Sequence, residues 1–244
     1  MRLFLVNYQY DGGECISTVQ SIWDGFDFSY ILEILLGLVP SLICITLHEL
    51  SHGLVAYLLG DDTAKRAGRL TLNPIKHLDP MGFLMMLVFH FGYAKPVPVN
   101  MFRFRNPKRG MAITALAGPV SNVLITIVFL FLFGLLAPIL AVNQVGQYVL
   151  QMIELTAYIS MGLAVFNLLP IPPLDGSKVL FSLLSDEGYL KLMRFERYGS
   201  LILLALVATG VLGRPLSAAI AWCYGRLFPI AQGAYSLSYS ILMH

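Results

Sequence analysis

The stretch Leu47-His48-Glu49-Leu50-Ser51-His52-Gly53 decides how this chain folds and what it binds, because it places three polar groups inside a long apolar run from about residue 28 to 59. In lipid, a helix is the only structure that such a run can form alone. On that helix His48 and His52 are four residues apart, so both imidazoles leave from one face. Two imidazoles at this separation can hold a zinc ion, and Glu49 can act on a water at the metal.

The alternative is a purely structural role for these residues. A single histidine in a membrane helix more often makes an interhelical hydrogen bond, and Glu49 could pair with either histidine. Burying two histidines and a glutamate in hydrocarbon is costly, however, and here all three groups occur at the spacing used in metal-assisted hydrolysis. The pattern therefore favours a metal site with one Zn²⁺ per chain.

The composition indicates a membrane protein. Of the 244 residues 57% are hydrophobic and only 12% are charged, which is too apolar for a soluble domain of this size. The net charge of +2 indicates no particular partner, and no basic cluster with interleaved aromatics suggests nucleic acid. Cys15, Cys44 and Cys223 are too scattered for a disulfide framework, and Cys44 is expected to serve packing.

The apolar runs predict an all-α polytopic membrane protein. About five spanning helices are expected, at residues 28–60, 111–140, 148–169, 199–213 and 215–231. The apolar run at 81–94 is too short to span, and the prolines that follow it forbid a continuing helix. We expect a short re-entrant or extended β element there, pairing with extended residues near 66–73 to form a small sheet.

The sequence predicts that the chain divides into three regions. Residues 1–27 are expected to form an external tail, because acidic residues interrupt them and they do not resemble a signal peptide. Residues 28–185 would form the core that carries the metal site. Residues 186–244 would add a surface helix and a helical hairpin.

The basic residues predict how the chain crosses the cell membrane. Of the 16 Lys and Arg residues, four lie in 61–80 and five in 95–109, whereas none lies between Gly110 and Ser177. Basic loops favour the cytoplasmic side, so both flanks of 81–94 are expected there. The histidines would then lie about 12–18 Å deep, toward the cytoplasmic half of a multi-pass protein.

A third metal ligand is expected from a carboxylate, and the candidates in or near the apolar regions are Glu33, Glu154 and Asp175. Glu33 is about four helical turns from His48, and Glu154 is expected near the outer end of its helix. Asp175 follows a break with three prolines and could meet the first helix. It could equally cap a helix that starts at Gly176, and chemistry alone does not decide between these roles.

Two signatures together resemble a known family. The stretches His48–Gly53 and Asn167–Gly176, in this order and in this hydropathic setting, resemble the site-2 protease family of intramembrane zinc metalloproteases. The stretches 73–82, 92–100 and 116–119 are similar to its compact bacterial members, and the likeness covers about residues 35–185. The PDZ and CBS modules of other members would not fit in this length, so sensing through them is not expected.

The resemblance implies a set of roles. His48, His52 and Asp175 would bind zinc, and Glu49 would be catalytic. Asn167 would lie near the site and orient substrate, although a helix-packing hydrogen bond is an equal alternative. The implied activity is hydrolysis of peptide bonds within or near transmembrane segments, in regulated intramembrane proteolysis or clearance of membrane remnants. The implied partners are membrane-protein substrates and the lipid bilayer.

A second class of function is a zinc-binding membrane adaptor or transporter without peptidase activity. Glu49 argues against it, because such a site has no need of a base beside the ligand. A transporter would also tend to show repeated halves, and the sequence shows none.

Overall fold

The computed structural model describes residues 28–80, 82 and 95–243. The expected N-terminal tail at 1–27 lies outside the described residues, as does the expected re-entrant segment at 81–94 except for Gly82. Residues 1–35 and the residues from Leu36 onward form two separate units. The fold and the site are described for the unit that begins at Leu36.

The described residues form helices joined by turns and short irregular segments. The elements are α2 (Phe28–Leu58), α3 (Thr63–Arg66), η1 (Pro74–Lys76), η2 (Met101–Arg103), α5 (Pro107–Leu140), α6 (Gln144–Asn167), α7 (Asp175–Ser182), α8 (Asp186–Ala208), α9 (Gly213–Leu227) and α10 (Pro229–Leu242). The predicted all-α class is confirmed for this part of the chain. It contains an isolated bridge at Leu78 but no strand, so the expected β element is not confirmed.

Asparagine caps set the ends of the two central helices. The Asn106 side chain accepts a hydrogen bond from the Arg109 N–H, and Pro107 occupies the first turn of α5. The Asn143 side chain accepts from the Gly146 N–H at the start of α6. Such caps satisfy backbone donors that have no partner within the helix, so they place both helix starts.

Three described helices are long and apolar enough to cross a membrane: Leu36–Leu58, Pro107–Leu140 and Gln144–Asn167. The stretches Tyr198–Ala208 and Gly213–Leu242 pass the same test together, but they meet at a bend of 89°. Among the described residues this gives three spans, or up to four if the bent pair counts as one. The expected five spans are therefore not confirmed.

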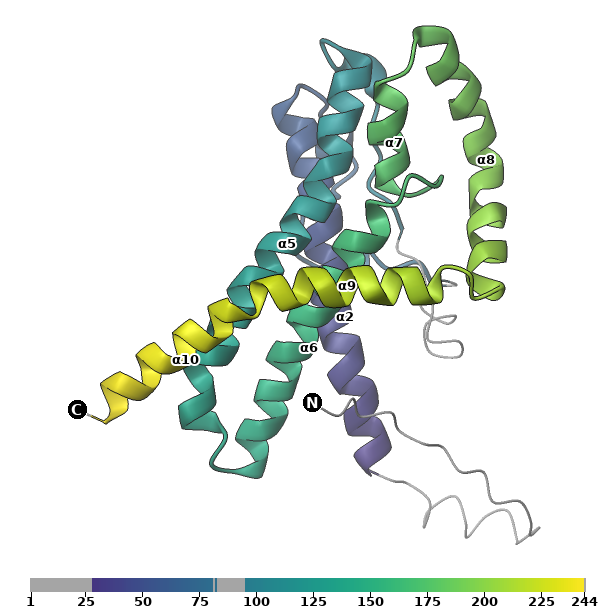
Figure 1. Ribbon diagram of the computed structural model, residues 1–244. Coiled ribbons are helices and arrows are strands. Elements are labelled where there is room, and N and C mark those ends of the chain that lie inside the picture. Colours follow the sequence, from purple (N-terminus) through teal and green to yellow (C-terminus); the bar gives the residue numbers. More distant parts are fainter. Residues whose placement is uncertain (1–27, 81, 83–94, 244) are drawn as a thin grey trace, which may run out of the picture. The chain divides into compact units, whose positions relative to one another are not determined.

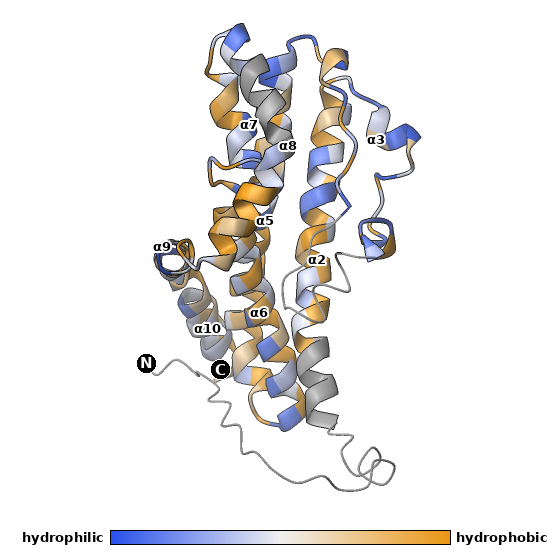
Figure 2. Ribbon diagram, turned by 90° about the vertical axis from the view of Figure 1, so that its right-hand side faces the viewer, coloured by the Kyte–Doolittle hydropathy of each residue, from blue (hydrophilic) through white to orange (hydrophobic). Residues whose placement is uncertain are grey.

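Helix α5 is the centre of the packing, because α6, α7 and α10 all lie against it (Figure 1). Leu130 of α5, Ala157 of α6 and Ala231 of α10 form a buried apolar cluster. Hydrophobic residues dominate α5 and α6, and hydrophilic residues gather at α3 and in the loops (Figure 2). Two histidine side chains of α2 contact polar groups of α5, and these contacts belong to the site described next.

Candidate active site

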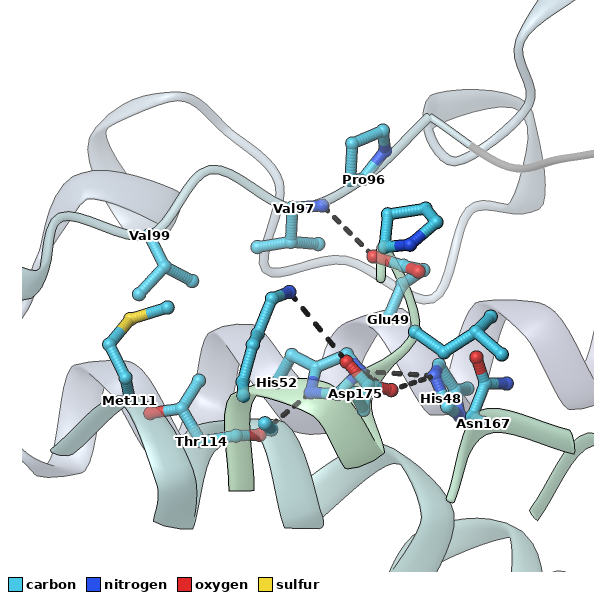
Figure 3. Close-up of a pocket in the computed structure, with 14 residues that line it drawn as sticks. His48, Glu49, His52, Pro96, Val97, Val99, Met111, Thr114, Asn167 and Asp175 are labelled. Atoms are coloured by element: carbon cyan, nitrogen blue, oxygen red, sulfur yellow. Dashed lines mark hydrogen bonds and ion pairs between the residues drawn. The ribbon is translucent and has the colours of Figure 1, made fainter. Parts of the chain in front are cut away.

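The two histidines of α2 point their Nε2 atoms toward each other. His48 and His52 are buried, and their Nε2 atoms lie 3.0 Å apart. The four-residue spacing on one helix produces this arrangement, as the sequence predicted. Figure 3 shows both imidazoles turned toward the carboxylate of Asp175.

Asp175 reaches the histidines because the chain breaks between α6 and α7. A side chain at Gly176 could not be accommodated, since a Cβ there would lie within 3 Å of the Leu168 and Leu169 carbonyl oxygens. This close approach brings the first turn of α7 against the end of α6. Asp175 Oδ2 then lies 3.2 Å from Nε2 of both histidines.

The alternative role of Asp175 as a helix cap is not what the structure shows. The N-cap of α7 is Leu174, and no side-chain capping hydrogen bond is present. The Asp175 carboxylate instead faces the two imidazoles, and Lys178 Nζ lies 3.8 Å from its other oxygen, Oδ1.

The three candidate ligand atoms fit a zinc ion. Their mutual distances are 3.0, 3.2 and 3.2 Å. Ligand atoms in a tetrahedral zinc site with bonds of about 2.05 Å lie about 3.3 Å apart. Two imidazoles and one carboxylate, with a fourth position open, are also a donor set of catalytic zinc sites.

Asp175 is in the charge state that metal binding needs. Its burial disfavours the carboxylate, but hydrogen bonds from His48 and His52, the positive charge that His52 carries when protonated, and the charge of Lys178 outweigh that effect and lower the pKa of Asp175. The carboxylate is therefore ionised at neutral pH, as a metal ligand must be.

Glu49 lies beside the ligands and is held by the segment 95–100. A ligand atom of Glu49 lies within 4.8 Å of those of His48 and His52, but the Asp175 oxygen is closer to both imidazoles. The Val97 N–H donates a 2.9 Å hydrogen bond to Glu49 Oε2 (Figure 3). Glu49 is thus fixed next to the two histidines, and its carboxylate is near enough to count among the groups that could hold a metal.

A cavity of about 410 Å³ opens onto these residues. It is lined by His48, Glu49, His52, Pro96, Val97, Val99, Met111, Thr114, Ala115, Asn167, Pro173, Leu174, Asp175 and Lys178. The structure thus brings all five sequence-predicted site residues to one cavity. Of these five residues, Asn167 has the weakest link to the other four, because its Nδ2 donates to the Leu163 carbonyl of its own helix.

The other carboxylate candidates were Glu154 and Glu33. Glu154 is not among the lining residues, and the side chain of Glu33 lies outside the part that the structure describes.

One face of α5 was missed by the sequence analysis. Thr114, Gly118 and Asn122 recur every four residues and lie against the two histidines. The Thr114 carbonyl is 2.7 Å from His52 Nδ1, and the Asn122 amide nitrogen is 3.1 Å from His48 Nδ1. A Cβ at Gly118 would lie within 3 Å of Nε2 of both imidazoles. The only sequence signal was the matching four-residue spacing around Ala117-Gly118-Pro119.

Comparisons with known proteins identify relatives over most of the chain. A family model described as "Peptidase family M50" matches residues 135–210. The "Putative zinc metalloprotease YwhC" of Bacillus subtilis is 40% identical over 198 residues, covering 79% of this chain and 87% of that protein. No solved structure matches the chain significantly.

Two further relatives from other organisms carry the same description. Rip2 of Mycolicibacterium smegmatis is 31% identical over 201 residues, or 80% of this chain and 75% of the relative. MJ0611 of Methanocaldococcus jannaschii is 33% identical over 168 residues, or 67% and 80% of the two chains. These matches confirm the predicted resemblance and the predicted enzyme class. The chain therefore belongs to peptidase family M50, the site-2 protease family of metalloproteases.

Proposed function

We propose that this protein is an intramembrane zinc metalloendopeptidase that cleaves membrane proteins within or near their transmembrane segments. The observation that carries the proposal is the convergence of His48 Nε2, His52 Nε2 and Asp175 Oδ2 within 3.2 Å of one another, beside Glu49. Zinc is the metal named for the relatives, and these three atoms would hold one ion per chain. When bound there, zinc would acidify a water molecule and polarise the scissile carbonyl.

Glu49 would act as the general base and then as the general acid. Its carboxylate would take a proton from the attacking water and later deliver it to the leaving amine. The Val97 N–H holds one carboxylate oxygen at 2.9 Å, which orients the group toward the cavity. An adaptor or transporter that only binds zinc is less well supported, since it would have no use for this base.

Substrate would enter the cavity in an unwound form, because a helix hides its peptide bonds. The apolar walls include Val97, Val99 and Leu174, which suit residues of a transmembrane segment.

Asn167 would contact substrate through its amide oxygen, because its nitrogen is engaged within α6. The segment 95–100, which runs past Glu49, would offer an edge for the unwound strand.

The segment 95–100 would take part in this edge mainly as an acceptor. Lys95, Val97 and Asn100 direct their N–H groups to His77, Glu49 and Asp61, respectively. Pro96 and Pro98 have no N–H group to offer. The Arg69 guanidinium already donates to the Lys95 and Pro96 carbonyls, so a substrate strand beside this segment would donate hydrogen bonds to the carbonyls that follow them.

We propose that the protein is multi-pass in the cell membrane, with the active site toward the cytoplasmic half. The basic segments 61–80 and 95–109 support this orientation. Helix α2 ends at Leu58, so His52 and His48 lie six and ten residues from that end. This corresponds to a depth of about 9–15 Å.

The direct test is proteolysis of co-expressed single-span membrane proteins, with fragments identified by mass spectrometry. Cleavage should stop on addition of phenanthroline and return with added zinc, because chelation removes the metal. Glu49→Gln is the matched inactive control, since it should retain zinc but lack the base. Cleavage that persists in a metal-free preparation, or that Glu49→Gln performs at the wild-type rate, would rule the proposal out.

A further inference from the structure

The imidazole of His48 has a second partner, which lies on the side of the ring away from the candidate metal site. Asn122 of α5 is fully buried, and its Nδ2 lies 3.1 Å from His48 Nδ1. Its other amide atom, Oδ1, is buried without a hydrogen-bond partner among the described residues. A buried acceptor in this condition costs free energy, so the orientation of this amide needs a reason.

The position of the proton on the His48 ring gives a reason for the orientation of the Asn122 amide. If the Asn122 nitrogen donates to Nδ1, then Nδ1 has no proton, and the ring proton must be on Nε2. Nε2 is the atom that faces His52 and Asp175, where the metal would bind. A histidine that binds a metal through Nε2 carries its proton on Nδ1 and needs an acceptor there.

We propose that Asn122 is a positioning residue that, in the zinc-loaded protein, turns its amide oxygen to His48 Nδ1. The amide oxygen and nitrogen exchange places by a rotation about the last side-chain bond, with almost no change in shape. Oδ1 then accepts the Nδ1 proton, which leaves the Nε2 lone pair free for the metal. This inference rests on the proposed zinc site.

The partner of His52 shows the same arrangement already in place. The Thr114 carbonyl, 2.7 Å from His52 Nδ1, can only accept a hydrogen bond. His52 therefore carries a proton on Nδ1, so that its neutral ring presents an unprotonated Nε2 to the site. With the amide of Asn122 turned, α5 would offer an oxygen acceptor to each imidazole from the same helix face.

The backbone of Asn122 is held firmly enough to act as a template. Its carbonyl accepts hydrogen bonds from Ser160 Oγ of α6 at 2.9 Å and from Thr126 Oγ1 at 3.0 Å. Gly118, one turn earlier, lies directly against both imidazoles. Two packed helices therefore fix the distance between this amide and His48.

The test measures zinc affinity by chelator competition in purified, detergent-solubilised protein. Asn122→Leu keeps the size but removes the acceptor, and should weaken zinc binding by about 10- to 100-fold, the range found for lost partners of metal-binding histidines. Asn122→Asp supplies a carboxylate that can only accept, and should keep the affinity within about threefold or raise it. Thr156→Val is the packing control, because its buried hydroxyl bonds only within α6, to the Met152 carbonyl, and it should bind zinc like wild type.

Two results would overturn the inference: wild-type affinity in Asn122→Leu, or a loss of about tenfold or more in Asn122→Asp, which would mean that the nitrogen serves His48. If Asn122→Leu does not fold, Asn122→Asp decides alone. The proposed function would fail differently, through a wild-type protein that binds no zinc or a His48→Ala variant that binds it equally well.

Discussion

At the residue scale, three side chains from two segments of the chain meet at one point: His48 and His52 from α2 and Asp175 from α7. His48, Glu49 and His52 are fixed by their spacing on one helix, so the sequence alone places them. Asp175 depends on how α7 turns back from α6, which no local pattern determines. Asn122 was missed because a polar residue in an apolar helix is typical of helix packing as much as of a metal site.

Asp175→Ala should reduce zinc affinity by more than about tenfold and reduce proteolysis with it, because one of three ligands is lost while both imidazoles remain. Chelator competition on the purified variant measures the affinity. Glu187→Ala is the matched control, since it removes an exposed carboxylate from the following helix. Full zinc binding and full turnover in Asp175→Ala would show that Asp175 is not a ligand.

At the scale of elements, the contact between α2 and α5 decides whether the ligands meet. Gly118→Ala should weaken zinc binding and lower stability by about 1–3 kcal/mol, because the new methyl group would displace both imidazoles or the helix. Thermal unfolding and zinc competition measure the two effects. Gly225→Ala, in α9 with open space for its Cβ, should leave zinc binding unchanged and should not lower stability. A Gly118→Ala protein with wild-type affinity would mean that α2 and α5 are not in this close contact.

The turn after α2 provides a pH-dependent connection to the segment 95–100. Burial disfavours ionised Asp61, but hydrogen bonds from Thr63 and the Asn100 N–H, together with the charge of Arg103, lower the pKa of Asp61 below its ordinary value of 3.8. Its stabilising effect is therefore complete above about pH 3.8 and is lost as the pH falls through the lower, folded-state pKa.

Asp61→Asn should therefore lower the melting temperature at neutral pH, and the difference from wild type should shrink as the pH falls below 3.8. Melting curves across that range measure it. A difference that stays constant or grows toward acid pH would contradict the assigned role of the carboxylate.

At the scale of the whole molecule, composition predicted a protein with membrane-spanning helices, but the expected five regular spans are not confirmed. The runs 199–213 and 215–231 were each counted as a span, yet the helices there meet at 89° and count at most as one broken span. Hydropathy reports apolar length and not the angle between helices, so it cannot detect such a bend. The boundaries 1–27, 28–185 and 186–244 remain predictions.

The proposed orientation predicts which loops share a side of the membrane. In a background without Cys15, Cys44 and Cys223, single cysteines at Thr71 and Asn106 should react with a membrane-impermeant thiol reagent only from the cytoplasmic face. A cysteine at Val142, in the exposed turn between α5 and α6, should react only from outside. Labelling of Thr71 and Asn106 from opposite faces would show that the chain between them crosses the membrane.

The most direct test of the zinc site is X-ray absorption at the zinc edge on the purified protein. Coordination by His48, His52 and Asp175 predicts one zinc per chain with only nitrogen and oxygen neighbours at about 2.0–2.2 Å, including two imidazoles. His52→Ala should lose one imidazole from that shell. A sulfur neighbour at about 2.3 Å, or a wild-type spectrum unchanged by His52→Ala, would place the metal elsewhere and contradict the site.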